Sequence, residues 1–498
     1  MSPTGKSFLG RAGPLVVARL LSSGVTFFIP LILARVMSLT EYGAYKQLFL
    51  IFQLFYFVLP FGVAQSLYYF LPRTDARRPY LFQTLVMMLG AGLLAMGLIV
   101  ATAGFAAERF SNPALWEYRW PLGIYTGCLL GAWPLEISLT SRGKTGAAAK
   151  TYLISDSLRA AALVVPVLAG TGLRGLMLAN AAFAAGRLLV AWLVVLPGSD
   201  GPWWDRSLLV RQIRYAAPFG AAMALNMPQQ QLHQFVVSGA VSPELFAIYA
   251  VGCFQLPLVD LLYSPTSEVL MVRLGELERS GAWHEGVASF RAATTQLTYC
   301  FWPLAAFLFV AAPEFIGALF GAKFLSAVPL FRVSVLAVVL AVLPMDGTLR
   351  ARDLTGHIFR SYLLKALITV PLVFWAVKHF GMMGGVGSWA ATECLGKAVL
   401  FARVPQALSS PNHRVGWRDV IPWKVFGYAA GASVAAATAV LALRYVAPGL
   451  IASGEGLLGR AVPLAAAGGV FGVAYLGLLS AGGIQPMRLL AGLRRPKP

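Results

Sequence analysis

Residues 39–47 read LTEYGAYKQ and place a glutamate, a lysine, a glycine and two tyrosines between two long apolar stretches. A helix that crosses a bilayer needs about 20 predominantly apolar residues. We therefore interpret 39–47 as a connection on the outer side of a membrane, between a first span near 14–34 and a second near 48–71. An acidic side chain near a helix N-terminus is favoured by the helix dipole. We expect Glu41 to cap the second span rather than to contact a substrate.

The composition supports a membrane protein. Of 498 residues, 58% are hydrophobic and 12% are charged, against roughly 45–50% and 25% in soluble domains. The formal charge of +20 comes from Lys and Arg scattered between apolar segments, whereas a nucleic-acid surface needs a basic patch on a polar domain. The sequence therefore predicts contact with membrane lipids and no nucleic-acid partner.

The cysteines and the N-terminus indicate no further processing or metal chemistry. The four cysteines lie far apart inside apolar segments, without a CxxC pair, so neither a disulfide framework nor a metal site is expected. Lys6 and Arg11 precede an apolar stretch that is too long for the core of a signal peptide. We expect a retained first span.

Apolar runs bounded by charge, Gly and Pro predict fourteen transmembrane helices, with twelve as an alternative because two connections are very short. The predicted spans are 14–34, 48–71, 80–105, 121–141, 151–171, 173–197, 214–238, 246–272, 292–313, 326–348, 357–378, 383–402, 424–447 and 458–480.

The distribution of positive charge predicts the orientation. Most of the 40 Lys and Arg residues fall in the even-numbered connections and the C-terminal tail, and cytoplasmic loops carry such an excess. We expect a multi-pass membrane protein with both termini cytoplasmic. The polar stretch 273–290 predicts a short cytoplasmic surface helix, with a solvated linker as the alternative.

A weak internal repeat organises the spans. SPELFAIYA at 242–250 resembles the opening stretch, since Glu244 and Ala247 match Glu41 and Ala44. The order of span, outer turn, Glu-x-x-Ala and span is the same in both places. We infer two six-helix lobes, 1–205 and 206–405, related by a pseudo-twofold axis along the membrane normal, with two additional spans in 406–498. Transporters built from such repeats bind substrate between the repeats and alternate its access.

At the residue level, LARVMSLTEYGAYKQLFLIFQLFYFVLPFGVAQSLYYFLPR (33–73) and RYAAPFGAAMALNMPQQQLHQFVVSGAVSPELFAIYAVGCFQLPL (214–258) resemble bacterial polysaccharide flippases of the multidrug/oligosaccharidyl-lipid/polysaccharide exporter superfamily. The resemblance implies export of a polyprenyl-pyrophosphate-linked oligosaccharide, for O-antigen, capsule or exopolysaccharide, by alternating access through a cationic cavity between the lobes. It also implies a two-lobed all-α fold. We expect a monomer, and association with the polysaccharide polymerase machinery is a further candidate.

Ionisable residues at bilayer depth are functional candidates because they are costly there. We expect Asp156 to pair with Arg159, and Glu393 with Lys397, from their helical spacing. Bases without a nearby acid in the sequence would bind pyrophosphate, and polar side chains of the seventh span would contact sugars. The candidate substrate-binding residues are Arg19, Arg187, Arg332, Lys365, Asn226, Gln230, His233 and Gln234.

The role of four buried acids remains open. They could pair with these bases, or they could couple transport to H⁺ or Na⁺. They are Glu136, Asp260, Glu268 and Asp346.

Two alternatives differ from a flippase. A cation-coupled multidrug antiporter of the same superfamily should have an acidic cavity, whereas bases without a nearby acid prevail here. A polytopic glycan polymerase or ligase usually carries a large outer loop, and the predicted outer loops are short. The sequence contains no GxxxxGK[ST], HExxH or GxSxG motif. We therefore expect neither an enzyme nor a cofactor.

Overall fold

The computed structural model describes residues 24–409, 414–448 and 456–484. Every regular element in these ranges is a helix, which confirms the predicted all-α fold. The chain divides into two compact units, Met1–Ala250 and Val251–Pro498. The predicted lobe boundaries after residues 205 and 405 stay predictions.

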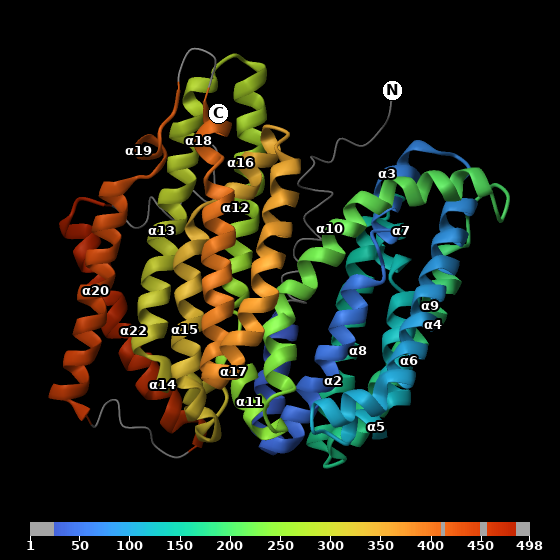
Figure 1. Cartoon of the computed structure of the whole chain (residues 1–498), viewed down its shortest axis with the longest axis horizontal. Coiled ribbons are helices and arrows are strands. Elements are labelled where there is room, and N and C mark those ends of the chain that lie inside the picture. Colours follow the sequence, from blue (N-terminus) through green and yellow to red (C-terminus); the bar gives the residue numbers. More distant parts are fainter. Residues whose placement is uncertain (1–23, 410–413, 449–455, 485–498) are drawn as a thin grey trace. The chain divides into compact units, whose positions relative to one another are not determined.

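The first unit begins, within the described residues, with a short apolar helix, Gly24–Val36. Its other helices are α2 (Leu39–Val58), η1 (Ala64–Ser66), α3 (Leu67–Phe70), η2 (Leu71–Arg73), α4 (Arg78–Arg109), α5 (Ala114–Glu117), α6 (Arg119–Gly131), α7 (Pro134–Ser141), α8 (Thr145–Leu168), α9 (Gly172–Val195), α10 (Arg206–Ser238) and α11 (Pro243–Gly252), which ends across the boundary (Figure 1).

The stretch 39–47 forms the first turns of α2 and is not a turn, because the helix begins at Leu39. Ser38 and Glu41 form a capping box at this end. The Ser38 hydroxyl accepts a hydrogen bond from the Glu41 amide at 3.2 Å, and the Glu41 carboxylate accepts one from the Ser38 amide at 3.1 Å. Two otherwise unpaired amides of the helix start are satisfied in this way. The predicted capping role of Glu41 is confirmed.

The predicted second span, 48–71, is not one helix. α2 ends at Val58, and the chain then passes through Phe61 and Gly62, both with positive φ, into the short helices η1, α3 and η2. Pro60 removes a backbone donor, and Gly62 adopts the left-handed conformation readily. The apolar run conceals this break from hydropathy alone.

Glycines let helices of the first unit approach closely. A Cβ on Gly92 of α4 would lie 2.2 Å from the Gly127 carbonyl oxygen of α6, and one on Gly43 of α2 would lie 1.8 Å from the Pro243 carbonyl oxygen. Beside this second contact, the Thr40 hydroxyl donates to the Glu244 carboxylate at 2.6 Å. The two stretches that resemble each other in sequence therefore pack against each other.

The second unit contains α12 (Pro257–Arg279), η3 (Trp283–Glu285), α13 (Gly286–Val310), α14 (Ala312–Leu319), η4 (Ala322–Ala327), α15 (Val328–Val339), η5 (Leu340–Val342), α16 (Met345–Ala351), α17 (Thr355–Phe401), α18 (Val404–Leu408), α19 (Trp417–Val420), α20 (Trp423–Val446) and α22 (Gly456–Ala481).

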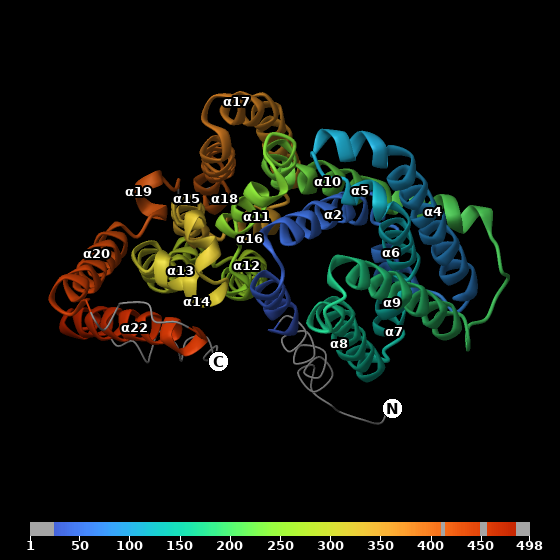
Figure 2. The same cartoon turned by 90° about the horizontal axis from the view of Figure 1, so that it is seen from below.

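The last two long helices, α20 and α22, lie side by side and pack on α13 (Figures 1 and 2). Their shared core is rich in small residues such as Ala432, Ala436 and Ala467. An ion pair also joins α20 to α14, because Arg444 of α20 donates to the carboxylate of Glu314 in α14 at 2.6 Å. These helices match the predicted additional C-terminal spans, 424–447 and 458–480.

One boundary in the second unit differs from the prediction, and another agrees with it. The predicted surface helix at 273–290 is wrong, because α12 continues to Arg279 and α13 already begins at Gly286, which leaves only a tight turn and η3 between them. The regular helix α17 contains a reversal at Gly381, whose φ of 56° and ψ of −135° are not helical. This reversal separates the predicted spans 357–378 and 383–402.

Nine helices of the described ranges are long and apolar enough to cross a membrane, or ten if α11 and α12, bent by 43°, count as one span. The protein is therefore multi-pass. The count is below fourteen because the predicted span 48–71 is broken after Val58, α10 is polar, α17 counts once and the first helix is described only from Gly24. Fourteen spans stay a prediction.

Candidate functional site

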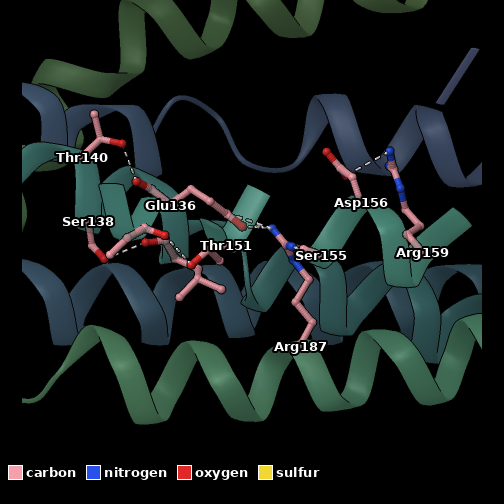
Figure 3. Close-up of polar contacts among 10 residues, drawn as sticks. Glu136, Ser138, Thr140, Thr151, Ser155, Asp156, Arg159 and Arg187 are labelled. Carbon is pink, nitrogen blue, oxygen red and sulfur yellow. Dashed lines mark hydrogen bonds and ion pairs between the residues drawn. The ribbon is translucent and has the colours of Figure 1, made fainter. Parts of the chain in front are cut away.

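A buried ion pair links two helices of the first unit (Figure 3). One nitrogen of the Arg187 guanidinium, in α9, lies 2.8 Å from both carboxylate oxygens of Glu136, in α7. A second guanidinium nitrogen donates to the Ser155 hydroxyl of α8. The side chain of Glu136 is 4% exposed and that of Arg187 is 18% exposed. The pair therefore connects α7, α8 and α9 in a largely water-free environment.

This pairing corrects the view of Arg187 as a base without a nearby acid, and it realises for Glu136 the pairing with a base that the sequence left open. An isolated charge in a membrane interior costs several kcal/mol, and pairing across helices removes much of that cost. The partners are far apart in sequence, so helical spacing could not reveal the contact. As a pair they carry no net charge.

A second ion pair lies beside the first, as Figure 3 shows. Asp156 and Arg159 of α8 are 3.3 Å apart, as their i,i+3 spacing predicts. Arg159 also lies within 3.3 Å of the Thr26 hydroxyl and donates to it. The predicted pair is confirmed, and it ties α8 to the helix Gly24–Val36.

Aromatic rings line α2 and α6 near these charges. Tyr56 packs on Trp133 with ring centroids 4.3 Å apart, and Phe52 packs on Tyr125 at 4.9 Å. Trp133 immediately precedes α7, the helix that carries Glu136. The aromatic side chains thus help to position the acid of the ion pair.

Lys46 of α2 is a candidate that our sequence reasoning overlooked. Its half-buried ammonium lies 5.4 Å from the ring centroid of Tyr42 and 5.8 Å from that of Tyr45. No described carboxylate lies within ion-pair distance of it. Contact with aromatic rings stabilises a cation by about 0.5–2 kcal/mol, less than its desolvation costs. The sequence feature that could have revealed this candidate is a lysine in an apolar helix, one turn after Tyr42.

The polar residues of α10 lie in the first unit. Asn226, Gln230 and Gln234 are half-buried, whereas His233 is buried. The Nδ1 atom of His233 lies 2.6 Å from the Tyr249 hydroxyl. The three amides keep partly accessible polar atoms, while the histidine is engaged within the fold.

Arg19 lies outside the described residues. Its predicted role in substrate binding therefore remains a prediction from the sequence.

In the second unit, Lys365 of α17 binds Glu393, which lies on the other limb of the same hairpin. The predicted pair of Glu393 with Lys397 is wrong in this respect, because the reversal at Gly381 brings Lys365 to the carboxylate. Lys397 instead lies 5.7 Å from the Tyr263 ring centroid. Lys365 is thus not an unpaired base.

The other candidate charges of this unit have different surroundings. Asp346 of α16 accepts a hydrogen bond from the Tyr263 hydroxyl at 3.1 Å. Asp260 and Glu268 of α12 are exposed. Arg332 of α15 donates to the Phe309 carbonyl at 3.1 Å and lies near the Phe309 ring, without a carboxylate partner among the described residues. The predicted set is therefore distributed over both units.

The described residues contain no group of three or more His, Cys, Asp or Glu side chains that could hold a metal ion. The chemistry they offer is charge pairing, amide hydrogen bonding and aromatic contact. Interactions of these kinds can bind a polar ligand.

Similarity to known proteins defines the family. The family model for polysaccharide biosynthesis proteins matches residues 32–329, more than half of the chain. No curated protein matches the chain in sequence.

Solved structures share the fold at low identity. The lipid II flippase MurJ, in an inward closed conformation, aligns with a TM-score of 0.71 and 10% identity over 94% of this chain and 99% of its own. An inward-facing multidrug resistance transporter of the MATE family aligns with a TM-score of 0.60 and 13% identity over 80% of this chain and 98% of its own. A transporter from Pyrococcus furiosus aligns with a TM-score of 0.52 and 12% identity over 82% and 98%.

The last two structures are of MOP superfamily transporters. The family and the fold agree with the expected polytopic membrane protein of polysaccharide biosynthesis. The chain belongs to the family of polysaccharide biosynthesis proteins, and it has the fold of the MOP superfamily transporters.

Proposed function

We propose that the chain is a flippase that moves polyprenyl-pyrophosphate-linked oligosaccharides from the inner to the outer leaflet of the bacterial cytoplasmic membrane, for surface polysaccharide synthesis. The observation that carries the proposal is the family match over residues 32–329. The structural likeness to the lipid II flippase MurJ supports it further.

Cations without carboxylate partners support binding of a pyrophosphate. Among the described residues, Lys46 and Arg332 contact aromatic rings and have no acid within ion-pair distance. Charge-assisted hydrogen bonds to a phosphate would replace the solvation that each cation loses. Arg19 joins them as a candidate from the sequence. Arg187 and Lys365 would first have to leave Glu136 and Glu393.

If a pyrophosphate replaced Glu136 as the partner of Arg187, the exchange would provide a route to ion coupling. A pyrophosphate that drew Arg187 away would leave Glu136 buried without a counter-charge, at a cost of several kcal/mol. Taking up a proton or Na⁺ at Glu136 would remove that cost. Asp346, held by Tyr263, and the exposed Asp260 and Glu268 are further candidates for coupling.

The half-buried amides of α10 are suited to the glycan. Asn226, Gln230 and Gln234 each offer donors and acceptors that match sugar hydroxyls. His233 already contacts Tyr249 and is the weakest of the four predicted contacts. Transport would proceed by alternating access, with both termini cytoplasmic, in a monomer that works beside the polymerase machinery.

The proposal is tested in a bacterium from which the gene is deleted. We expect loss of surface polysaccharide and accumulation of the lipid-linked oligosaccharide on the inner leaflet, where a membrane-impermeant glycosidase added outside cannot reach it. A plasmid copy should restore export, and Arg19→Ala should not, at equal protein abundance.

The same experiment separates the alternatives. Accumulation of single units on the outer leaflet would point to a polymerase or ligase instead. Normal polysaccharide together with increased sensitivity to cationic drugs would point to a multidrug antiporter.

A further inference from the structure

A polar pocket of about 260 Å³ lies at one end of the α17 hairpin, in the second unit. The reversal at Gly381 allows the start and the end of the hairpin to meet there. Both segments belong to connections that the Lys and Arg distribution predicts to be cytoplasmic. The pocket is lined by Asp353, Leu354, Gly356, His357, Arg360, Arg403 and Gln406.

Two arginines give the pocket its charge. Arg360 donates only to the Gly356 carbonyl of its own helix, at 3.2 Å, and Arg403 donates to the Gln406 side chain at 2.5 Å. Neither has a carboxylate within ion-pair distance among the described residues, whereas the nearby Arg352 is bound to Glu278. Since a guanidinium has five N–H donors, most donors of the first two remain available for a ligand.

The backbone at the start of α17 is also open. The helix begins without a side-chain cap. The amides of His357 and Ile358 both donate to the Leu354 carbonyl, so only the amides ahead of them lack an acceptor within the helix. A Cβ built on Gly356 would meet only a guanidinium nitrogen of Arg360, at 3.9 Å. An anion can therefore approach the helix start, where the dipole favours negative charge.

One carboxylate opposes an anion in the pocket. Asp353 follows the end of α16 and has a φ of 54°. Its amide donates to the Arg350 carbonyl, and the amide of Leu354 donates to the Leu349 carbonyl. Glycine or asparagine is usual at this position of a helix end. The fold does not require a carboxylate there, so the charge balance of the pocket can be changed without altering the backbone.

An apolar surface continues from the pocket along α17. Leu363, Leu364 and Leu367 follow Arg360 by three, four and seven positions and therefore share its helical face. Their exposed fractions are 42%, 43% and 67%. A polar pocket at the end of an exposed apolar stripe matches a ligand with a charged head and hydrocarbon chains.

We propose that this pocket binds the phosphate group of an anionic membrane lipid, with the acyl chains along the leucine stripe. Two guanidiniums and a helix N-terminus suit phosphate oxygens. The volume is below the roughly 300–1,000 Å³ of pockets for drug-sized ligands, so the pocket holds a headgroup rather than a whole glycan. The site is independent of the proposed transport of oligosaccharides.

The test is native mass spectrometry of the full-length protein released from nanodiscs of phosphatidylcholine alone or with phosphatidylglycerol. We expect selective retention of phosphatidylglycerol. In the double variant Arg360→Gln and Arg403→Gln its affinity should fall at least about tenfold, the factor that corresponds to about 1.4 kcal/mol. Asp353→Asn should strengthen binding, an effect that misfolding cannot mimic.

Arg279→Gln is the matched control. Arg279 is an exposed arginine at the end of α12, and its connection is also predicted to be cytoplasmic. An equal loss of lipid in this control, or unchanged affinity in the double variant and in Asp353→Asn, would overturn the proposal. So would binding of inorganic phosphate in detergent as tight as that of the lipid, because free phosphate would then be the ligand.

Discussion

Breaking the Glu136–Arg187 ion pair is expected to destabilise the first unit strongly. Glu136→Gln leaves a guanidinium that cannot lose its proton at 18% exposure, in contact with Ser155 only. Removing one partner of a buried pair costs about 3–5 kcal/mol. Arg187→Gln should cost less, because a carboxyl left alone can take up a proton and become neutral.

A double-mutant cycle checks the expected loss of stability. The double variant Glu136→Gln and Arg187→Gln has no unpaired charge, so we expect it to recover most of the loss of Glu136→Gln. At roughly 2–4 °C per kcal/mol for a domain of this size, Glu136→Gln should lower the thermal midpoint by about 6–20 °C.

The assay is thermal unfolding of the detergent-purified protein, followed by the monodisperse fraction that survives heating. A matched control is the exposed pair Arg273–Glu285, which is 3.2 Å apart with both side chains 50% exposed. Glu285→Gln should cost no more than about 1 kcal/mol. If Glu136→Gln behaved like Glu285→Gln, or if the double variant showed the sum of the single losses, the described pairing would be refuted.

Three further predictions concern single residues. Gly43→Ala should sharply reduce the amount of folded protein, because the new Cβ would lie 1.8 Å from the Pro243 carbonyl oxygen. Gly90→Ala is the control and should not reduce it, because Gly90 faces open space. Equal yields of the two variants on size-exclusion chromatography would contradict the close packing at Gly43. Lys46→Gln should reduce surface polysaccharide at unchanged protein abundance, and Lys46→Arg should retain most of it; full export in the glutamine variant would exclude a role for that cation in transport. Asp205→Ala should destabilise the start of α10 at neutral pH. Because hydrogen bonds from the first turn lower the pKa of Asp205, the difference in stability between the variant and the wild type should disappear as the pH falls through that lowered pKa. A difference in stability that persisted in acid would show that the carboxylate charge is not involved.

Local patterns in the sequence predicted local features of the structure. Hydropathy located most of the long helices, the helix dipole placed Glu41 at a helix start, and the i,i+3 spacing of Asp156 and Arg159 predicted their ion pair. Each of these features depends on residues within one or two helical turns, which a single sequence displays directly.

Contacts between helices could not be predicted in the same way. The partner of Glu136 is on another helix, and that of Lys365 is across a chain reversal. Their meeting depends on how helices are packed and rotated against each other, which composition and spacing do not determine. For the same reason Lys46 escaped notice, because its significance lies in the absence of an acid beside it in space.

The distance along the chain between Glu136 and Arg187 has a consequence for how the protein enters the membrane. Ribosomes deliver the acid first, in the candidate span with a mean hydropathy of only 1.2, and its counter-charge emerges with α9, later in synthesis. An ionised side chain without a partner is costly in a helix that enters the lipid. The helix that carries Glu136 is therefore stabilised in the lipid only after Arg187 has been made, so α6 to α9 should leave the translocon as one group rather than one by one.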